Sequence, residues 1–199
     1  MSKLDLTKLH EECYTSHPDP HVIEVPPWSF LTIAGRGAPG GKAYQEKLEP
    51  LYALAYRVKF LAKDTGNDYV VCKLEGLWWF DDPELPIAPP REQWNWKMMI
   101  RQPDFVAAEM IQEARRQVEA KKKLPAVHDV SFERYDEGLA AQIMHLGSYA
   151  GEDATIARLH AFIRERGRQP HGLHHEIYLS DPNKVAPEKL RTIIRQPIH

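Results

Sequence analysis

The stretch "RTIIRQP" (residues 191–197) has a near copy earlier in the chain, "KMMIRQP" (residues 97–103). Both copies start with a basic residue, continue with three mostly apolar residues and end in the same Arg-Gln-Pro. Each follows a run typical of a β-strand that carries one glutamate, "YVVCKLEGLWWF" (69–80) before the first copy and "LHHEIYLSD" (173–181) before the second. The near repeat indicates that one structural unit occurs twice.

Two helical patterns come before these pairs of strands, and each is itself preceded by a strand-like stretch. Apolar residues recur at helix spacing over 41–63 and again over 152–166. The stretches 28–37 and 138–147 resemble strands and end in glycine. The order strand, helix, strand, strand is therefore given twice. It predicts an α+β fold made of two modules with pseudo-twofold symmetry, whose antiparallel sheets pack together because neither could bury its apolar face alone.

We expect a single domain with repeats at about 22–103 and about 124–199. The segment between them, about 104–121, has the amphipathic pattern of a connecting helix. The stretch "DDPELPIAPPREQ" (81–93) contains four prolines in thirteen residues, which predicts an irregular loop between two strands.

Composition narrows the class of protein. The formal net charge of -2 gives no electrostatic footprint for a nucleic acid, and no run approaches the length of a membrane span. The two cysteines, Cys13 and Cys72, are too few for a disulfide framework, and no charged-then-apolar leader opens the chain. We therefore expect a cytoplasmic protein that binds neither nucleic acid nor membranes. The sequence predicts no particular oligomeric state.

Tryptophan is concentrated in the first repeat. In the strand-like stretch "QWNWKMMIRQ", alternation places Trp94, Trp96 and Met98 on one face. Such a face is either core or a surface for planar ligands. The nearby Trp78 and Trp79 favour the ligand surface, because tryptophan and methionine together form a flat, polarisable and adaptable wall.

A glutamate interrupts the strand of the second repeat. Glu176 stands two residues from His174 and two from Tyr178, so all three share one face of a strand. Aligning the repeats places Glu75 at the position of Glu176. A carboxyl group buried against aromatic rings can act as a general acid or base, or as the counter-charge for a cation. The alternative is the polar face of a sheet that meets water.

The sequence gives less support to a metal site, a nucleotide site or a covalent nucleophile. The stretch "HGLHHE" (171–176) suggests zinc, but only His174 and Glu176 could reach one ion, and no second cluster has a familiar ligand spacing. The stretch "GRGAPGGKA" (35–43) lacks the glycine spacing and the hydroxyl residue of a phosphate-binding loop. No serine or cysteine has a nucleophile signature. We expect no metal and no organic cofactor.

The duplicated layout, the "EIYLSDP" strand and the ending "VAPEKLRTIIRQPI" resemble the GyrI-like small-molecule-binding proteins, relatives of the effector-binding domains of multidrug-responsive regulators. The resemblance covers the chain from about Val22. It implies a central aromatic cleft between the two modules, with Glu176 pointing into it and a hydrophobic aromatic small molecule as the ligand. No helix-turn-helix domain precedes the module, so we do not expect a DNA-binding activator.

Stand-alone members of this family resemble the chain more closely, and some are hydrolases that open the strained cyclopropane ring of planar DNA-alkylating compounds. That resemblance implies a cofactor-independent hydrolase. Glu176 or Glu75 would deprotonate a water molecule, and Tyr178 or Tyr149 would hydrogen-bond the ligand oxygen. The alternative is a module that sequesters hydrophobic compounds without converting them. The remaining candidates for the ligand-binding surface are Trp78, Trp79, Trp94, Trp96, Met98 and His174.

Overall fold

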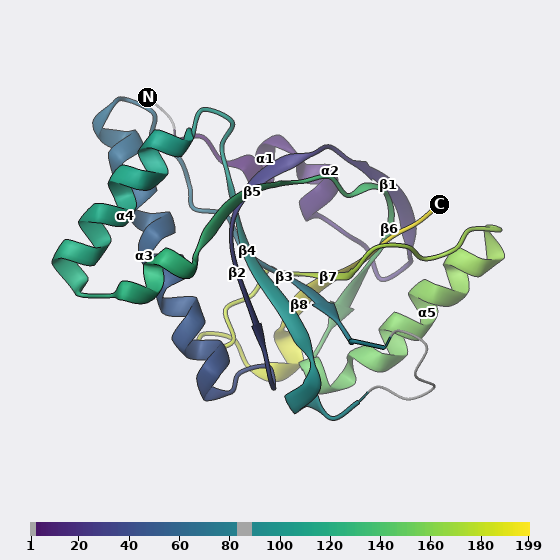
Figure 1. Cartoon of the computed structure of the whole chain (residues 1–199). Coiled ribbons are helices and arrows are strands. Elements are labelled where there is room, and N and C mark those ends of the chain that lie inside the picture. Colours follow the sequence, from purple (N-terminus) through teal and green to yellow (C-terminus); the bar gives the residue numbers. More distant parts are fainter. Residues whose placement is uncertain (1–2, 83–88) are drawn as a thin grey trace. The chain divides into compact units, whose positions relative to one another are not determined.

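The computed structural model describes residues 3–82 and 89–199 and shows an α+β protein with antiparallel strands (Figure 1). The chain forms two compact units. The first contains Trp28–Cys72, the described part of Trp78–Tyr135 and the residues up to Leu6. The second contains Thr7–Pro27, Lys73–Leu77 and Asp136–His199. Neither unit is a continuous stretch of sequence.

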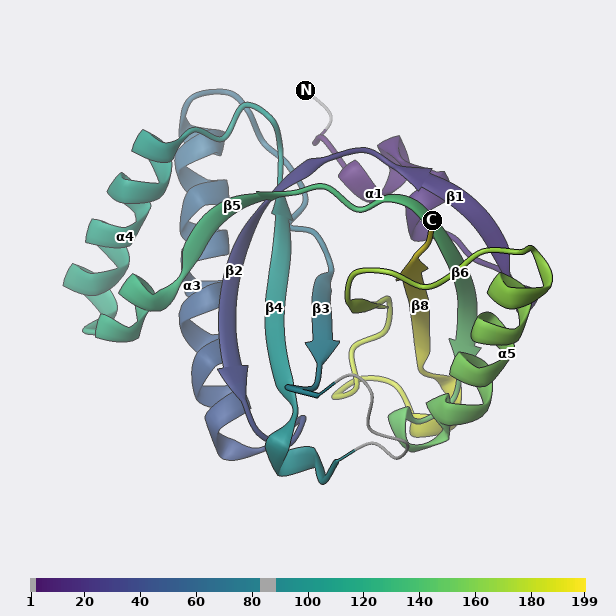
Figure 2. The same ribbon diagram turned by 45° about the vertical axis from the view of Figure 1, so that its right-hand side comes forward.

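The first unit is built around β2 (Trp28–Arg36). It pairs antiparallel with β4 (Asn95–Gln102) on one side and with β5 (Ser131–Tyr135) on the other. Helix α3 (Lys42–Asp64) runs along β2 and β4, and α4 (Ala108–Lys122) lies against α3 on the side away from these strands (Figure 2). Two short 3-10 helices complete the unit, η1 (Arg91–Gln93) and η2 (Pro125–Asp129).

Helix α3 forms where it does because its apolar residues repeat with the helical period. The stripe that it buries includes Leu51, Leu54 and Val58, all completely buried. The helix begins after Gly41 and ends before Gly66, which has a φ of +89° that favours glycine. This packing of α3 on β2 and β4 forms the core of the first unit.

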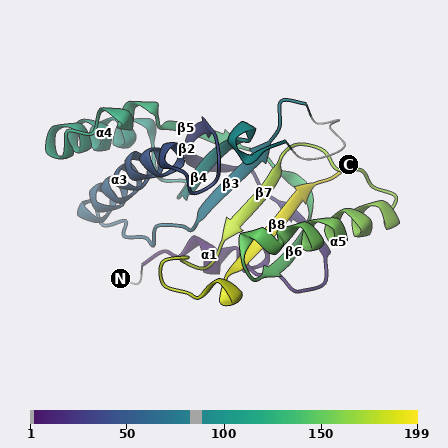
Figure 3. The ribbon, with the colours of Figure 1, turned by 90° about the horizontal axis from the view of Figure 1, so that it is seen from below.

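The second unit contains four antiparallel strands in the order β1-β6-β8-β7. Helix α5 crosses one face of this sheet (Figure 3). Its Leu159 and Ile163 pack against Ala141, Ile143 and Ile194 of the strands to form the core. The strands and the α-helices of this unit are β1 (His21–Val25), β6 (Gly138–Leu146), β7 (His174–Tyr178), β8 (Arg191–Pro197), α2 (Glu11–Tyr14) and α5 (Glu152–Glu165).

Four shorter features complete the description. The 3-10 helices η3 (Tyr149–Gly151) and η4 (Pro187–Lys189) lie in the second unit, and α1 (Leu6–Leu9) begins at the boundary between the units. Strand β3 (Leu74–Trp79) is divided, with its residues up to Leu77 assigned to the second unit and the remainder to the first.

The predicted order of elements is confirmed, since strand, helix, strand, strand occurs as β2-α3-β3-β4 and again as β6-α5-β7-β8. The connecting helix expected at about 104–121 is α4. Each compact unit contains residues of both repeats. Strand β1 of the first repeat pairs with β6 of the second, and β5 of the second repeat pairs with β2 of the first. Part of the loop expected over 81–93 lies outside the described residues, and its end forms η1. Within the described ranges, no helix is both long and apolar enough to span a membrane.

Candidate functional site

Glu176 lies in the middle of β7 and is 9% exposed. Nε2 of His174 is 3.1 Å from its Oε1, and the Tyr178 hydroxyl donates a 2.7 Å hydrogen bond to its Oε2. The three side chains therefore lie on one face of the strand, as the period of two predicts. Both carboxylate oxygens are held, so the orientation of the group is fixed.

The pKa of Glu176 is lowered despite its burial. Burial alone would raise this pKa, because it disfavours the charged form. The hydrogen bond and positive charge of His174, the hydrogen bond from Tyr178 and the charge of His175 together outweigh that effect. Glu176 is therefore a buried group that is ionised at neutral pH and can accept a proton.

A second carboxyl group, Glu152, lies beside the first. It is the first residue of α5, is buried, and lies close enough to Thr192 of β8 and to Glu176 for both to affect its pKa. Its Oε1 has no hydrogen-bond partner among the described residues. Burial and the neighbouring negative charge of Glu176 raise the pKa of Glu152 to about 9. Glu152 is therefore protonated at neutral pH and can donate a proton.

Two tyrosine rings lie next to these carboxyl groups. The ring centroids of Tyr149 and Tyr178 are 5.8 Å apart in an edge-to-face arrangement. Tyr149 is 36% exposed. The burial of the rest of its side chain and the nearby charges of Glu152 and Glu176 raise its pKa. Its hydroxyl therefore stays protonated and remains a hydrogen-bond donor at the edge of the site. Tyr149 and Tyr178 thus lie with Glu176 as the sequence predicted, and Glu152 joins them.

His145 organises the turn that carries Tyr149 and Glu152. Its Nε2 is 3.0 Å from the carbonyl oxygen of Ser148, and its Nδ1 is 2.9 Å from the Thr155 hydroxyl. A carbonyl oxygen only accepts, so Nε2 carries the proton and Nδ1 accepts from the threonine. The ring therefore links the residue before η3 to the first turn of α5.

The other predicted carboxylate, Glu75, lies in a different cluster. It accepts a 3.0 Å hydrogen bond from the Tyr14 hydroxyl, and its Oε2 is 3.1 Å from Nε2 of His175. His175 alternates with Glu176 along β7 and so points to the opposite face of the strand. The structure therefore does not bring Glu75 together with Glu176.

The cluster around Glu75 is a buried network of two acidic and two basic side chains. Nδ1 of His175 is 2.8 Å from Glu137, and Nη1 of Arg195 is 2.8 Å from the same carboxylate. Arg195 also donates to Gln142 and to the carbonyl oxygen of Cys13. The network is neutral overall, since two carboxylates face one guanidinium and one imidazolium.

The network shifts two pKa values in opposite directions. Burial alone would lower the pKa of His175, but the charges and hydrogen bonds of Glu137 and Glu75 raise it to about 9. Burial alone would raise the pKa of Glu137, but the charges of His175 and Arg195 lower it to about 2. His175 is therefore an imidazolium at neutral pH, and its charge also favours the ionised form of Glu176.

The tryptophans belong to the first unit. Trp96 and Met98 are completely buried, with the Tyr44 ring of α3 at 5.1 Å from Trp96 and the Tyr44 hydroxyl at 3.1 Å from Sδ of Met98. Trp78 is stacked on the same tyrosine with centroids 6.2 Å apart. The predicted alternation is present, but the face that carries Trp96 and Met98 is covered by α3.

Two tryptophans remain partly exposed, Trp79 and Trp94. Trp94 packs edge-to-face on Trp78, with centroids 6.0 Å apart, and donates from its indole nitrogen to the carbonyl oxygen of Pro89. The predicted role of the tryptophans as a ligand surface stays a prediction. No three His, Cys, Asp or Glu side chains of residues 3–82 and 89–199 are grouped as metal ligands.

The chain is similar to proteins of a known family. A family model described as the GyrI-like small molecule binding domain matches residues 18–199. An uncharacterized conserved protein from Listeria innocua is 36% identical with a TM-score of 0.93, covering 99% of this chain and all of its own. A protein from Listeria innocua described as a hydrolase is also 36% identical, with a TM-score of 0.88 and the same coverage of both chains.

The EcmrR C-terminal domain is 13% identical with a TM-score of 0.59, covering 91% of this chain and 97% of its own, and so is similar in fold alone. Among proteins with curated descriptions, none matches the chain.

Proposed function

Because the chain belongs to the GyrI-like small-molecule-binding family, we propose that its second unit binds planar hydrophobic molecules and hydrolyses an electrophilic cyclopropane ring in them. The proposal goes beyond small-molecule binding in its reaction and in its substrate class. A hydrolytic reaction is supported by the 36% identity to a Listeria innocua protein described as a hydrolase. The substrate class is the one implied by the resemblance to stand-alone members of the family that open cyclopropane rings, and the carboxyl groups are chemically suited to that reaction.

The proposal is carried by two neighbouring buried carboxyl groups whose surroundings shift their pKa values in opposite directions. The pKa of Glu176 is lowered, whereas that of Glu152 is raised to about 9. Two carboxyl groups whose surroundings push their pKa values apart are the usual arrangement of a general base and a general acid. Such a pair can remove a proton from water and deliver another to a leaving oxygen at the same pH.

The reaction follows from these roles. Glu176 accepts a proton from a water molecule, and the water oxygen bonds to the strained carbon of the cyclopropane. The carbon-carbon bond of the ring breaks, and its electron pair moves into the conjugated dienone. The dienone oxygen becomes a phenolate and takes the proton of Glu152. One water molecule is added overall, as a hydroxyl group on carbon and a hydrogen on oxygen.

The two carboxyl groups can also return to their starting protonation states. After ring opening Glu176 is protonated and Glu152 is ionised. Because the two groups are close enough to shift the pKa of Glu152, the proton can return from Glu176 to Glu152. The buried Oε1 of Glu152 has no hydrogen-bond partner within the described part of the chain. We assign this atom as the one that donates the proton to the substrate oxygen.

The tyrosines supply binding and orientation. Tyr178 donates to Glu176, which leaves that carboxylate oriented for the water. The hydroxyl of Tyr149 can donate to the substrate oxygen, and its partly exposed ring offers a flat apolar face beside the acids. No step requires a metal or an organic cofactor.

The test is turnover of a cyclopropane-bearing alkylator in ¹⁸O-labelled water, followed by mass spectrometry. We expect ring-opened product in molar excess over protein, with one ¹⁸O on carbon. Glu176→Gln and Glu152→Gln should each lose most of the activity, whereas Glu188→Gln, at an exposed position of the second unit, should retain it. Product without labelled oxygen, or full activity in both site variants, would sink the proposal.

Binding without conversion is the second candidate function. A buried carboxylate beside two tyrosine rings is also suited to a hydrophobic cation. In that case the alkylator would be recovered unchanged, and a cationic aromatic compound would bind at least tenfold more tightly than its neutral analogue. The Glu176→Gln variant would then remove that preference.

A further inference from the structure

A groove between α3 and α4 in the first unit has the features of a separate ligand site. It encloses a volume of about 400 Å³, within the range of about 300–1,000 Å³ typical of small-molecule pockets. Ten residues line it, and all of them belong to the two helices. The carboxyl groups proposed for hydrolysis lie in the other unit.

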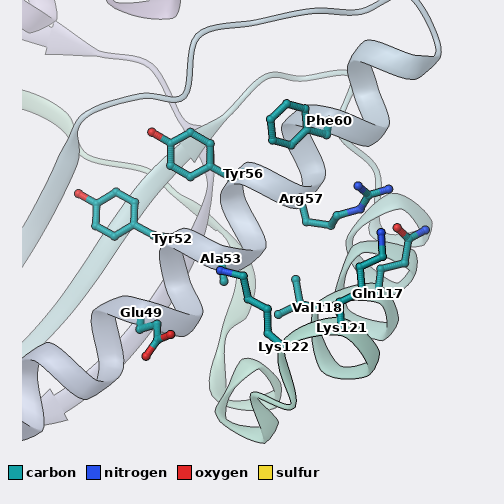
Figure 4. Close-up of a pocket in the computed structure, with 10 residues that line it drawn as sticks. All are labelled: Glu49, Tyr52, Ala53, Tyr56, Arg57, Phe60, Gln117, Val118, Lys121 and Lys122. Atoms are coloured by element: carbon teal, nitrogen blue, oxygen red, sulfur yellow. The ribbon is translucent and has the colours of Figure 1, made fainter.

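One flank of the groove is aromatic. Tyr52, Tyr56 and Phe60 are spaced four residues apart, so they form a row along α3. Tyr56 is 49% exposed and Phe60 is 47% exposed. Figure 4 shows Tyr52 and Tyr56 pointing to the same side of the helix. A row of exposed rings on one helix is a surface on which a planar aromatic group can stack.

The other flank is cationic. Arg57 points from α3 towards α4, where Lys121 and Lys122 lie in the last turn (Figure 4). Neither lysine forms an ion pair with any described residue, and both are exposed. Among the described residues, Glu49 is the only acidic side chain that lines the groove. Three cations and one carboxylate line the groove, and Glu113 of α4 also interacts with the charge of Arg57. The excess of positive charge therefore comes from the two lysines, and it is complementary to an anion.

Small apolar residues of both helices complete the lining. Ala53 of α3 and Val118 of α4 also line the groove (Figure 4). A ring stacked on Tyr52 and Tyr56 could place a charged substituent beside an ammonium group of α4. A volume of about 400 Å³ suits one compact molecule that carries both features.

We propose that the groove between α3 and α4 binds small planar aromatic anions, such as aromatic carboxylates, independently of the carboxyl groups of the second unit. The rings supply stacking surface, and the lysines with Arg57 supply the counter-charge. A neutral analogue loses the charge complement, and a cationic analogue is repelled.

The test uses 2-naphthoate, with 2-naphthalenemethanol and 2-naphthylmethylamine as neutral and cationic analogues. Amide chemical shifts of the ¹⁵N-labelled protein would be followed during titration. We expect naphthoate to perturb residues of α3 and α4, and to bind more tightly than either analogue. Exposed charge pairs contribute about 0.2–1 kcal/mol each, so Lys121→Gln/Lys122→Gln should weaken binding by about two- to thirtyfold. Added salt should weaken it further.

A matched variant separates a local effect from a change in net charge. Lys8→Gln/Lys189→Gln also removes two exposed lysines, but from the second unit, and should leave the affinity unchanged. Tyr56→Leu should weaken binding of naphthoate while keeping an apolar side chain. Equal binding of the three analogues, equal losses in both double variants, no binding, or shifts confined to the second unit would each overturn the proposal.

Discussion

The Tyr178 hydroxyl donates a 2.7 Å hydrogen bond to Oε2 of Glu176, two residues earlier on the same face of β7. This bond is one of the contacts that keep the buried carboxylate ionised. A hydrogen bond to a charged group contributes about 1.5–3 kcal/mol, which is enough to move a pKa by one unit or more. Tyr178 is therefore, after His174, one of the residues that set the basicity of the site.

We predict that Tyr178→Phe raises the pKa of Glu176 by about one to two units, because it removes the donor and keeps the ring. The carboxyl ¹³C shift of Glu176, followed by NMR against pH, measures this directly. Tyr69→Phe removes a buried hydroxyl that donates to Gln102 in the first unit, and serves as the control. An equal shift of the Glu176 pKa in both variants would contradict the role of the Tyr178 bond.

The same pair of carboxyl groups predicts a bell-shaped dependence of ring opening on pH. The base must be ionised, so the rate falls at low pH as Glu176 is protonated, below the ordinary range of a glutamate. The acid must be protonated, so the rate falls again as the pH rises through about 9. Initial rates between pH 3 and pH 10 test this. A flat profile to pH 10 would remove Glu152 as the proton donor.

The period of two in "HHEIYLSD" predicted which side chains surround Glu176, and the structure confirms that His174 and Tyr178 contact it. The sequence could not reveal the second carboxyl group. Glu152 lies at the start of a helix, where an acidic residue ordinarily has favourable electrostatics with the helix dipole. Only the tertiary packing of α5 on β8 shows that it is buried beside Glu176.

Repeat alignment was less informative for Glu75. The alignment matched it to Glu176 but could not predict its face or its partners. The partner residues come from distant positions, 61 residues away for Tyr14 and 100 residues away for His175. Likewise, alternation placed Trp96 and Met98 on one face, yet it could not tell which face α3 covers. Long-range packing decides both questions.

We predict that Gly35→Ala destabilises the first unit. A Cβ atom at this position would lie 2.3 Å from the Trp96 ring, which is completely buried and cannot move without displacing Tyr44. Overpacking of this kind costs about 1–3 kcal/mol. Urea unfolding measures the loss, and Ala34→Ser, at the neighbouring exposed position, should change stability little. Adding Trp96→Phe to Gly35→Ala should recover part of the loss if the ring is the cause.

We predict that Glu137→Gln is among the most destabilising single changes in the second unit. Glu137 contacts both His175 and Arg195, each at 2.8 Å, and all three side chains are buried. Removing one member of a buried ion pair costs about 3–5 kcal/mol, because it leaves the other charge without compensation. Glu188→Gln, on the surface of the same unit, is the control for urea unfolding. A loss below about 1 kcal/mol would show that the network contributes little.

The network also predicts how stability changes with pH. His175 has a pKa raised from 6.5 to about 9, so its contribution is fully present below pH 6.5 and is lost as the pH rises through about 9. Glu137 has a pKa lowered from 4.5 to about 2, so its contribution is present above pH 4.5 and is lost as the pH falls towards 2. The contribution of the network should therefore be greatest between about pH 4.5 and 6.5.

The alkaline decline has two sources that can be separated. Glu152 also binds a proton more tightly in the folded state, so it too lowers stability as the pH rises from 4.5 to about 9. Urea unfolding of Glu152→Gln between pH 6 and pH 9.5 removes that source. We expect a decline of up to about 3 kcal/mol to persist in this variant, since a rise in the pKa of His175 from 6.5 to about 9 corresponds to that amount. A flat profile in Glu152→Gln would mean that His175 does not hold its proton in the folded state, and Glu137 and Glu75 would then face an uncharged imidazole.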